Sequence, residues 1–232
     1  MSVSQDGKVV LLSAGLKMIV AEQKASDWSS WTLRFNQTFF KFVPGSGFLS
    51  EDASILAFHC YQGVCVHRYN PTNNSYDLMY QVAPYGTLDV GEVSMNAKAG
   101  LLVVTSEDDN QGRLWTAAAY NLSTGDPLWS FVSQLSSGVE GDTVASLSIT
   151  DDGKYVAVGT WGDNDNLNPQ LHVFQGIGGN GVPLLAYVCP GSVTYVHVKS
   201  NPATSSAVVM VLGLQQHQNQ GMIGGLAFSL TL

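Results

Sequence analysis

Polar turns alternate with short apolar runs along the whole chain, and two of these turns are near copies of each other. The segment Ser4-Gln5-Asp6-Gly7-Lys8-Val9-Val10 returns as Thr150-Asp151-Asp152-Gly153-Lys154-Tyr155-Val156. Degenerate versions of the same turn and run lie at 50–56, 96–102 and 200–203. No window of a dozen residues repeats apolar positions at the three- and four-residue spacing of a helix. The pattern therefore predicts short β-strands and almost no helix.

The turns stand roughly 45 to 50 residues apart, a period that is typical of propeller blades. A blade is a four-stranded antiparallel meander, with the innermost strand first. The strand runs give five such units, with approximate limits 1–43, 44–88, 89–141, 142–191 and 192–232, and the last unit lacks an outer strand. We therefore predict an all-β fold, a β-propeller of about five four-stranded antiparallel blades with the last one incomplete. It forms either a single domain or an arc of a larger propeller.

Composition narrows the classes of partner. Hydrophobic residues make up 45% of the 232 residues and charged residues only 12%, so the chain can bury a core. The net charge of −8, without a basic cluster, argues against an electrostatic grip on nucleic acid or on anionic lipid. We therefore expect no nucleic-acid partner. No run is long and apolar enough to be inserted into a membrane as a helix.

One segment carries a family resemblance. The run Ala119-Tyr120-Asn121-Leu122-Ser123-Thr124-Gly125-Asp126-Pro127-Leu128-Trp129 resembles the repeat of quinoprotein-like propellers, in which Ala, Asp, Gly and Trp recur at these spacings. In that repeat Asn121 stands in place of Asp and builds, with Gly125, the turn before the outer strand, and Trp129 packs between blades. The Asp-Gly-Lys turns with the following Val156-Ala157-Val158-Gly159 equally resemble WD40-like repeats.

The resemblance bears on function. Quinoprotein-like propellers include dehydrogenases that bind pyrroloquinoline quinone and calcium, and also scaffolds without a cofactor. Those enzymes resemble one another in a pair of adjacent cysteines, which this sequence does not contain. We predict a non-catalytic scaffold without a cofactor, which presents loops to a protein or glycan partner within a larger assembly. The alternatives are a fragment of a pyrroloquinoline-quinone-dependent dehydrogenase, or a hydrolase or lyase with acid and base in the central channel.

Two cysteines flank a sequence that is typical of a hairpin turn. A two-residue turn at Gln62-Gly63 sets Cys60 and Cys65 directly opposite each other, where a cross-strand disulfide fits. The alternatives are two free thiols, or a metal site that adds His67, although no fourth zinc ligand stands at a suitable spacing. We expect the remaining Cys189 to be buried.

The connections between second and third strands lengthen in the last three units, at 107–111, 163–168 and 215–220. In a propeller these connections emerge on one face, and function concentrates in loops held by a rigid scaffold. Asp163 and Asp165 alternate as in calcium loops, but the third carboxylate and the distant Glu of such loops are missing, which favours a solvated loop. We predict that this rim binds the partner. The candidate binding residues are Asp108, Asp109, Asn110, Asp163, Asn164, Asp165, Gln216 and His217.

Three glycosylation acceptor sequences, at Asn36, Asn73 and Asn121, together with the hairpin cysteines, favour an extracytoplasmic or secreted location. No signal peptide is recognised, because the apolar stretch 9–21 contains Ser13, Gly15 and Lys17 and is typical of two short strands. The chain also begins inside the first repeat, which allows for residues upstream.

Overall fold

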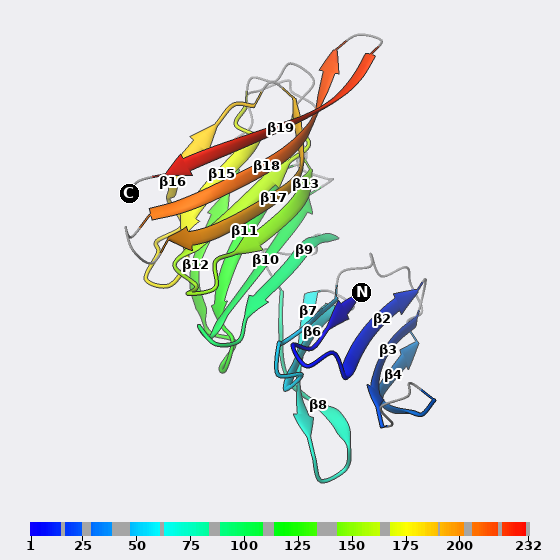
Figure 1. Ribbon diagram of the computed structural model, residues 1–232. Helices are drawn as coiled ribbons and strands as arrows, with labels where there is room; N and C mark the ends of the chain where they lie inside the picture. Colours follow the sequence, from blue (N-terminus) through cyan, green and yellow to red (C-terminus); the bar gives the residue numbers. More distant parts are fainter. Residues whose placement is uncertain are drawn as a thin grey trace. The chain divides into compact units, whose positions relative to one another are not determined.

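The computed structural model describes residues 1–14, 17–24, 29–38, 47–60, 63–83, 89–108, 114–133, 143–162, 168–189, 191–201, 206–217 and 220–230. All regular structure in these segments is β-strand. The contacts group the chain into two compact units, Met1–Ala83 and Pro84–Leu232 (Figure 1).

The first unit consists of two antiparallel sheets, each of four strands paired in chain order. The first sheet contains β1 (Ser2–Val3), β2 (Val9–Ala14), β3 (Lys17–Gln23) and β4 (Trp31–Thr38). The second contains β5 (Gly47–Leu49), β6 (Ile55–Cys60), β7 (Gly63–Asn70) and β8 (Ser75–Val82).

The second unit consists of three antiparallel sheets, two of four strands and one of three. The third sheet contains β9 (Asp89–Asn96), β10 (Leu101–Asp108), β11 (Leu114–Asn121) and β12 (Pro127–Val132). The fourth contains β13 (Val144–Ile149), β14 (Tyr155–Thr160), β15 (Leu171–Gln175) and β16 (Pro183–Tyr187). The fifth contains β17 (Ser192–Asn201), β18 (Ser206–His217) and β19 (Gln220–Leu230).

The sequence prediction of an all-β fold with four-stranded meanders and an incomplete last sheet is confirmed. The hairpin of the fifth sheet differs in one respect from the expectation of a polar loop at 215–220. Strand pairing continues as far as His217 opposite Gln220, because extended backbone can carry the ladder even through a Gln-rich stretch. The organisation as a single domain stays a prediction.

The repeated polar turn is closed by one hydroxyl and one carboxylate. The Ser4 hydroxyl donates to Asp6 Oδ1 at 2.7 Å and accepts from the Val9 amide at 2.9 Å. The Lys8 amide donates to the same carboxylate oxygen at 3.0 Å. Gly7 has φ +72°, a left-handed conformation that costs glycine little. The turn thereby satisfies the amide of Lys8 and the first amide of β2, that of Val9.

The same network recurs in the second and fourth sheets, with Ser50 donating to Asp52 at 2.7 Å and Thr150 to Asp152 at 2.8 Å. The third sheet uses an amide instead, since Asn96 Oδ1 accepts from the backbone of its own turn at 2.9 Å. The short polar side chains that the repeat preserves are therefore the ones that shape the turn.

Neighbouring turns within each unit are also linked to each other. In the first unit the Gln5 amide donates to the Glu51 carbonyl at 2.7 Å. In the second unit Asn96 Nδ2 donates to the carbonyls of Thr150 and Asp151 at 2.8 and 2.9 Å. The turns thus fix the spacing of adjacent sheets as well as the start of each second strand.

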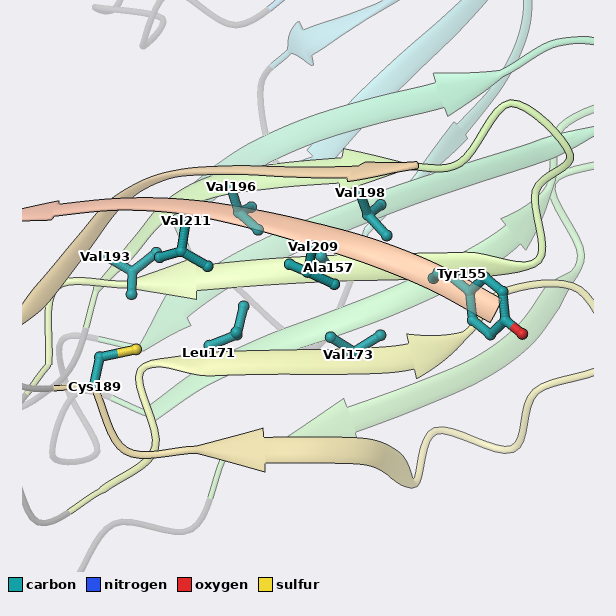
Figure 2. Packing of buried hydrophobic residues seen from close by; sticks show 11 residues of the cluster. Tyr155, Ala157, Leu171, Val173, Cys189, Val193, Val196, Val198, Val209 and Val211 are labelled. Carbon is teal, nitrogen blue, oxygen red and sulfur yellow. The ribbon is translucent and has the colours of Figure 1, made fainter. Parts of the chain in front are cut away.

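Apolar side chains from adjacent sheets fill the space between them. Figure 2 shows the cluster between the fourth and fifth sheets, where Val173 and Leu171 of β15 face Val193, Val209 and Val211. The hydroxyls of Ser146 and Ser148 on β13 accept hydrogen bonds from the amides of Val196 and Val198 on β17, at 3.0 and 3.2 Å. Backbone polar groups at this interface are therefore satisfied across the sheets.

The Thr150 turn gives a direct test of the network. Thr150→Val keeps the shape of this fully buried side chain but removes the hydroxyl that bonds to Asp152 and to the Tyr155 amide. Because the buried Tyr155 amide then lacks its acceptor, we expect the free energy of unfolding in urea to fall by about 1–3 kcal/mol. Thr150→Ser, which keeps the hydroxyl, is the control. Equal losses in both variants would show that the methyl group matters and the hydroxyl does not.

His172 predicts a pH dependence of stability. Its ring is buried between the rings of Trp115 at 4.9 Å and Phe131 at 5.6 Å, and within the described residues its Nδ1 atom has no hydrogen-bond partner. Burial lowers the pKa of His172 to about 4 from the ordinary 6.5, so the unfolded chain takes up the proton first as the pH falls. Stability is then fully present above about pH 6.5 and decreases towards pH 4, by about 3 kcal/mol for this group.

The variant His172→Phe separates this contribution from that of His59, whose pKa burial also lowers to about 4. We expect a shallower fall of the free energy of unfolding between pH 7 and pH 4.5 in the variant, measured by urea titration at each pH. An unchanged slope would mean that His172 titrates as an ordinary histidine.

Candidate functional site

A polar cleft of about 280 Å³ lies in the first unit, where the turns of the two sheets meet the outer half of the first sheet. Two of its walls are the turn between β1 and β2 and the turn between β5 and β6. The side chains of Glu22 on β3 and Arg34 on β4 form another part of the lining. The lining residues are Gln5, Asp6, Lys8, Val9, Glu22, Arg34, Glu51, Asp52 and Ala53.

Arg34 is the most firmly held side chain of the cleft. Its Nη2 lies 2.7 Å from Glu22 Oε1 and its Nε donates to Oε2 at 3.2 Å, a paired geometry that suits guanidinium and carboxylate. The guanidinium carbon lies 4.1 Å above the centre of the Tyr69 ring, and the side chain is only 11% exposed. The Lys24 ammonium contacts the same carboxylate. Arg34 is thus a neutralised part of the wall.

Three carboxylates of the cleft, those of Asp6, Glu22 and Asp52, have pKa values below the ordinary range and therefore stay ionised to lower pH. Burial raises the pKa of Glu22, but hydrogen bonds from Lys24 and Arg34 outweigh it and the pKa is lowered. The hydrogen bond from Ser4 lowers the pKa of Asp6. Burial also raises the pKa of Asp52, but the hydrogen bonds of its turn outweigh this effect and the pKa is lowered.

The charges of the cleft do not balance. Four carboxylates, those of Asp6, Glu22, Glu51 and Asp52, line the cleft together with two cations, Lys8 and Arg34. Lys24, outside the lining, also contacts the Glu22 carboxylate. Since Glu22 is neutralised by Arg34, the excess of negative charge lies on the exposed turn residues. Nowhere in the described segments do three His, Cys, Asp or Glu side chains converge closely enough to hold a metal ion. The surface of the cleft is therefore negatively charged.

The structure describes the backbone of three of the eight binding residues predicted from the sequence. Asp108 ends β10, with its backbone opposite Leu114, whereas Gln216 and His217 lie in β18. Asp109, Asn110, Asp163, Asn164 and Asp165 lie outside the described residues. Their neighbour Glu107 links two sheets, because its carboxylate accepts from the Val144 amide at 3.0 Å. The role of the rim in binding stays a prediction.

Trp129 lies between the third and fourth sheets. Its Nε1 donates to the Gly176 carbonyl at 2.8 Å and its ring stacks on Phe174 at 5.3 Å. The turn before β12 is built by Asn121, whose side chain accepts from the Ser123 amide at 2.9 Å.

Cys60 and Cys65 form a disulfide, with their Cα atoms 5.7 Å apart. The register differs from the one predicted: Cys60 pairs with Gly63, and Phe58 pairs with Cys65. The cysteines are therefore diagonal neighbours, not directly opposite ones. Because the register is shifted by two positions, both side chains remain on the same face.

Gly63 explains why the predicted register is wrong. A Cβ atom at this position would lie 2.2 Å from the Val82 carbonyl oxygen of β8, so only glycine allows that approach. The glycine belongs to the strand and permits close contact with its neighbour, whereas the sequence pattern assigned it to the turn. Cys189 is buried and unbridged, as expected, and burial raises the pKa of its thiol to about 11.

Comparison with solved structures identifies the architecture. A chain of the mitotic checkpoint complex is similar over 97% of this chain and 64% of its own length, with a TM-score of 0.59 and 16% identity. A protein from Lactobacillus plantarum is similar over 99% of this chain and 70% of its own, with a TM-score of 0.61 and 14% identity. Hsv2p of Kluyveromyces lactis matches with a TM-score of 0.52 and 12% identity, over 95% and 69% of the two chains. The neighbours are propellers, including WD40-type folds. The chain is a β-propeller.

The likeness extends to the fold alone, since the identities are low. This propeller sequence spans between 64% and 70% of the length of the three structures. No protein-family model and no curated protein sequence matches it. A search of the described residues for a helix able to cross a membrane finds none.

Sequence reasoning missed the cleft of the propeller. Asp6 and Asp52 stood out in the repeat, but only as turn residues. Glu22 and Arg34 lie in β3 and β4, and nothing in the sequence around either residue indicates that they form an ion pair. A signal was available in part: an Arg and a Glu on neighbouring strands of an antiparallel meander are candidates for a cross-strand pair.

The disulfide gives a simple prediction. Denatured, unreduced protein should show one reactive thiol, that of Cys189, and the variant Cys189→Ala should show none. Because only five positions separate the bridged residues, replacing both by Ala should lower the free energy of unfolding by about 2 kcal/mol or less. Thiol titration before and after reduction makes the measurement. Three thiols before reduction would contradict the bridge.

Proposed function

We propose that this propeller is a non-catalytic scaffold for a protein partner and that the cleft of its first unit holds a basic side chain of that partner. The observation that carries the proposal is the unbalanced charge of the cleft. Asp6, Glu51 and Asp52 are exposed around a wall whose own cation, Arg34, is already paired. A lysine or arginine from outside can complete this arrangement by charge-assisted hydrogen bonds.

A protein partner fits this cleft better than a glycan. The lining carries an excess of negative charge, and most sugars have no positive charge that would pair with it. One of the similar propellers was solved as part of a protein assembly, the mitotic checkpoint complex. That setting supports the scaffold class for this chain, while the partner itself is inferred from the chemistry of the cleft. No feature of the described residues favours the dehydrogenase alternative.

We also propose an extracytoplasmic location. The Cys60–Cys65 bridge supports it, since disulfides persist mainly in oxidising compartments.

The proposal is tested with a labelled peptide of alternating Gly and Arg, titrated with the protein and followed by fluorescence anisotropy. Glu51→Gln removes one carboxylate from the cleft and leaves the Gln5–Glu51 backbone bond in place. We expect the dissociation constant to rise about fivefold, equivalent to about 1 kcal/mol. Lys8→Gln, which removes a competing cation, should lower it.

The matched control is Asp151→Asn. Asp151 holds the position in the fourth-sheet turn that Glu51 holds in the second, but it does not line the cleft. The same loss of one negative charge should therefore leave the dissociation constant unchanged. Equal effects of Glu51→Gln and Asp151→Asn would show that the peptide binds to net charge, and would refute the cleft as the site.

A further inference from the structure

The turn between β7 and β8 carries one of the three glycosylation acceptor sequences, Asn73-Asn74-Ser75. The other two begin in strands, since Asn36 pairs with Ile19 inside β4 and Asn121 is the last residue of β11. An N-linked glycan is bulky and needs a surface position, which a turn offers more readily than a strand. The structure therefore separates three sequences that are equivalent as motifs.

The acceptor sequence at Asn121 is the least accessible of the three. Asn121 is half-buried, and Leu122, the middle residue of this sequence, is only 1% exposed. The backbone of Asn121 is also bonded on both sides, because its amide donates to the Asp126 carbonyl and its carbonyl accepts from the Gly125 amide, each at 2.8 Å. This sequence thus belongs in part to the core.

Asn73, in contrast, is exposed in a turn that other residues hold in place. The Asn70 side chain at the end of β7 donates to Asp77 Oδ2 at 2.8 Å across the turn. Asn74 has φ +54°, a left-handed conformation that asparagine adopts more readily than most residues, and its Oδ1 accepts from the Tyr69 hydroxyl at 2.8 Å. None of these contacts involves the Asn73 side chain.

The carboxamide of Asn73 leaves its nitrogen available. Its Oδ1 accepts from the Ser75 hydroxyl at 2.9 Å, which joins the first and third residues of the acceptor sequence. Within the described residues Nδ2 makes only a long contact, 3.5 Å from Asp77 Oδ1. N-glycosylation replaces one of the two hydrogens on Nδ2, and the other remains for that contact. The modification therefore removes no hydrogen bond from the fold.

We propose that Asn73 is the site of an N-linked glycan and that Asn36 and Asn121 stay unmodified. The proposal rests on the extracytoplasmic location proposed above, because the modification belongs to secreted proteins. Nδ2 of Asn73 attacks the anomeric carbon of an oligosaccharide that is carried on a lipid pyrophosphate. The N–C bond forms as the C–O bond to the pyrophosphate breaks, the nitrogen releases one proton, and the lipid pyrophosphate leaves.

The experiment expresses the full chain with a cleavable leader peptide in insect cells and purifies it from the medium. The leader brings the chain into the secretory pathway whatever its natural location, so the result is independent of that location and of peptide binding at the cleft. Enzymatic removal of glycans in heavy-oxygen water, followed by mass spectrometry of peptides, labels each Asn that carried a glycan. We expect label at Asn73 in most copies and at Asn36 or Asn121 in few.

Matched variants change only the third residue of an acceptor sequence. Ser75→Ala removes the acceptor hydroxyl and leaves Asn73 in place, so the glycan should be lost, whereas Ser75→Thr restores the acceptor sequence and should keep it. Thr38→Ala and Ser123→Ala, the same change in the other two sequences, should leave the glycan content unchanged. Secreted chain that is unmodified at Asn73 in most copies, or modified equally at all three positions, would overturn the proposal.

Discussion

The bond between a Ser or Thr hydroxyl and the Asp two residues later is the contact on which the rest of this propeller depends. In each turn that has it, the hydroxyl also receives the first amide of the second strand, as in the Thr150–Tyr155 bond of 3.0 Å. One short polar pair therefore satisfies donors that would otherwise be buried without acceptors at the start of a strand. Because the turns also bond to their neighbours, as Asn96 does to Thr150, the same network sets the distance at which the apolar faces of adjacent sheets meet.

The cleft follows from the way the turns are placed. Two turns placed side by side bring Asp6 and Asp52 to one surface with their charges intact, because a carboxylate that accepts hydrogen bonds remains ionised. Arg34 lies beneath them only because Glu22 and the Tyr69 ring hold it there. A structural repeat can thus generate an anionic surface without any residue being dedicated to it.

Charged residues and prolines in the outer strands prevent most of the sheets from pairing with a further strand. Arg34 serves twice, as the ion partner of Glu22 and as the charged residue of the outer strand β4. Pro127 and Pro183 begin β12 and β16 and offer no amide to a further strand. Among the described residues the fifth sheet has three strands, and β18 and β19 form its long hairpin.

The fold was predictable because its determinants are local. A turn such as Ser4–Asp6 and the apolar run after it lie within a few residues, so their pattern specifies strand positions and even the missing outer strand. The disulfide was predictable for the same reason, since Cys60 and Cys65 share one hairpin. The register of its hairpin was not predictable, because Gly63 lies close to the Val82 carbonyl of another strand. A sequence does not show which glycine makes such a close contact. The pairing of Glu22 with Arg34, the isolation of His172 among aromatic rings and the cleft all depend on contacts between strands or sheets, and only the tertiary structure decides them.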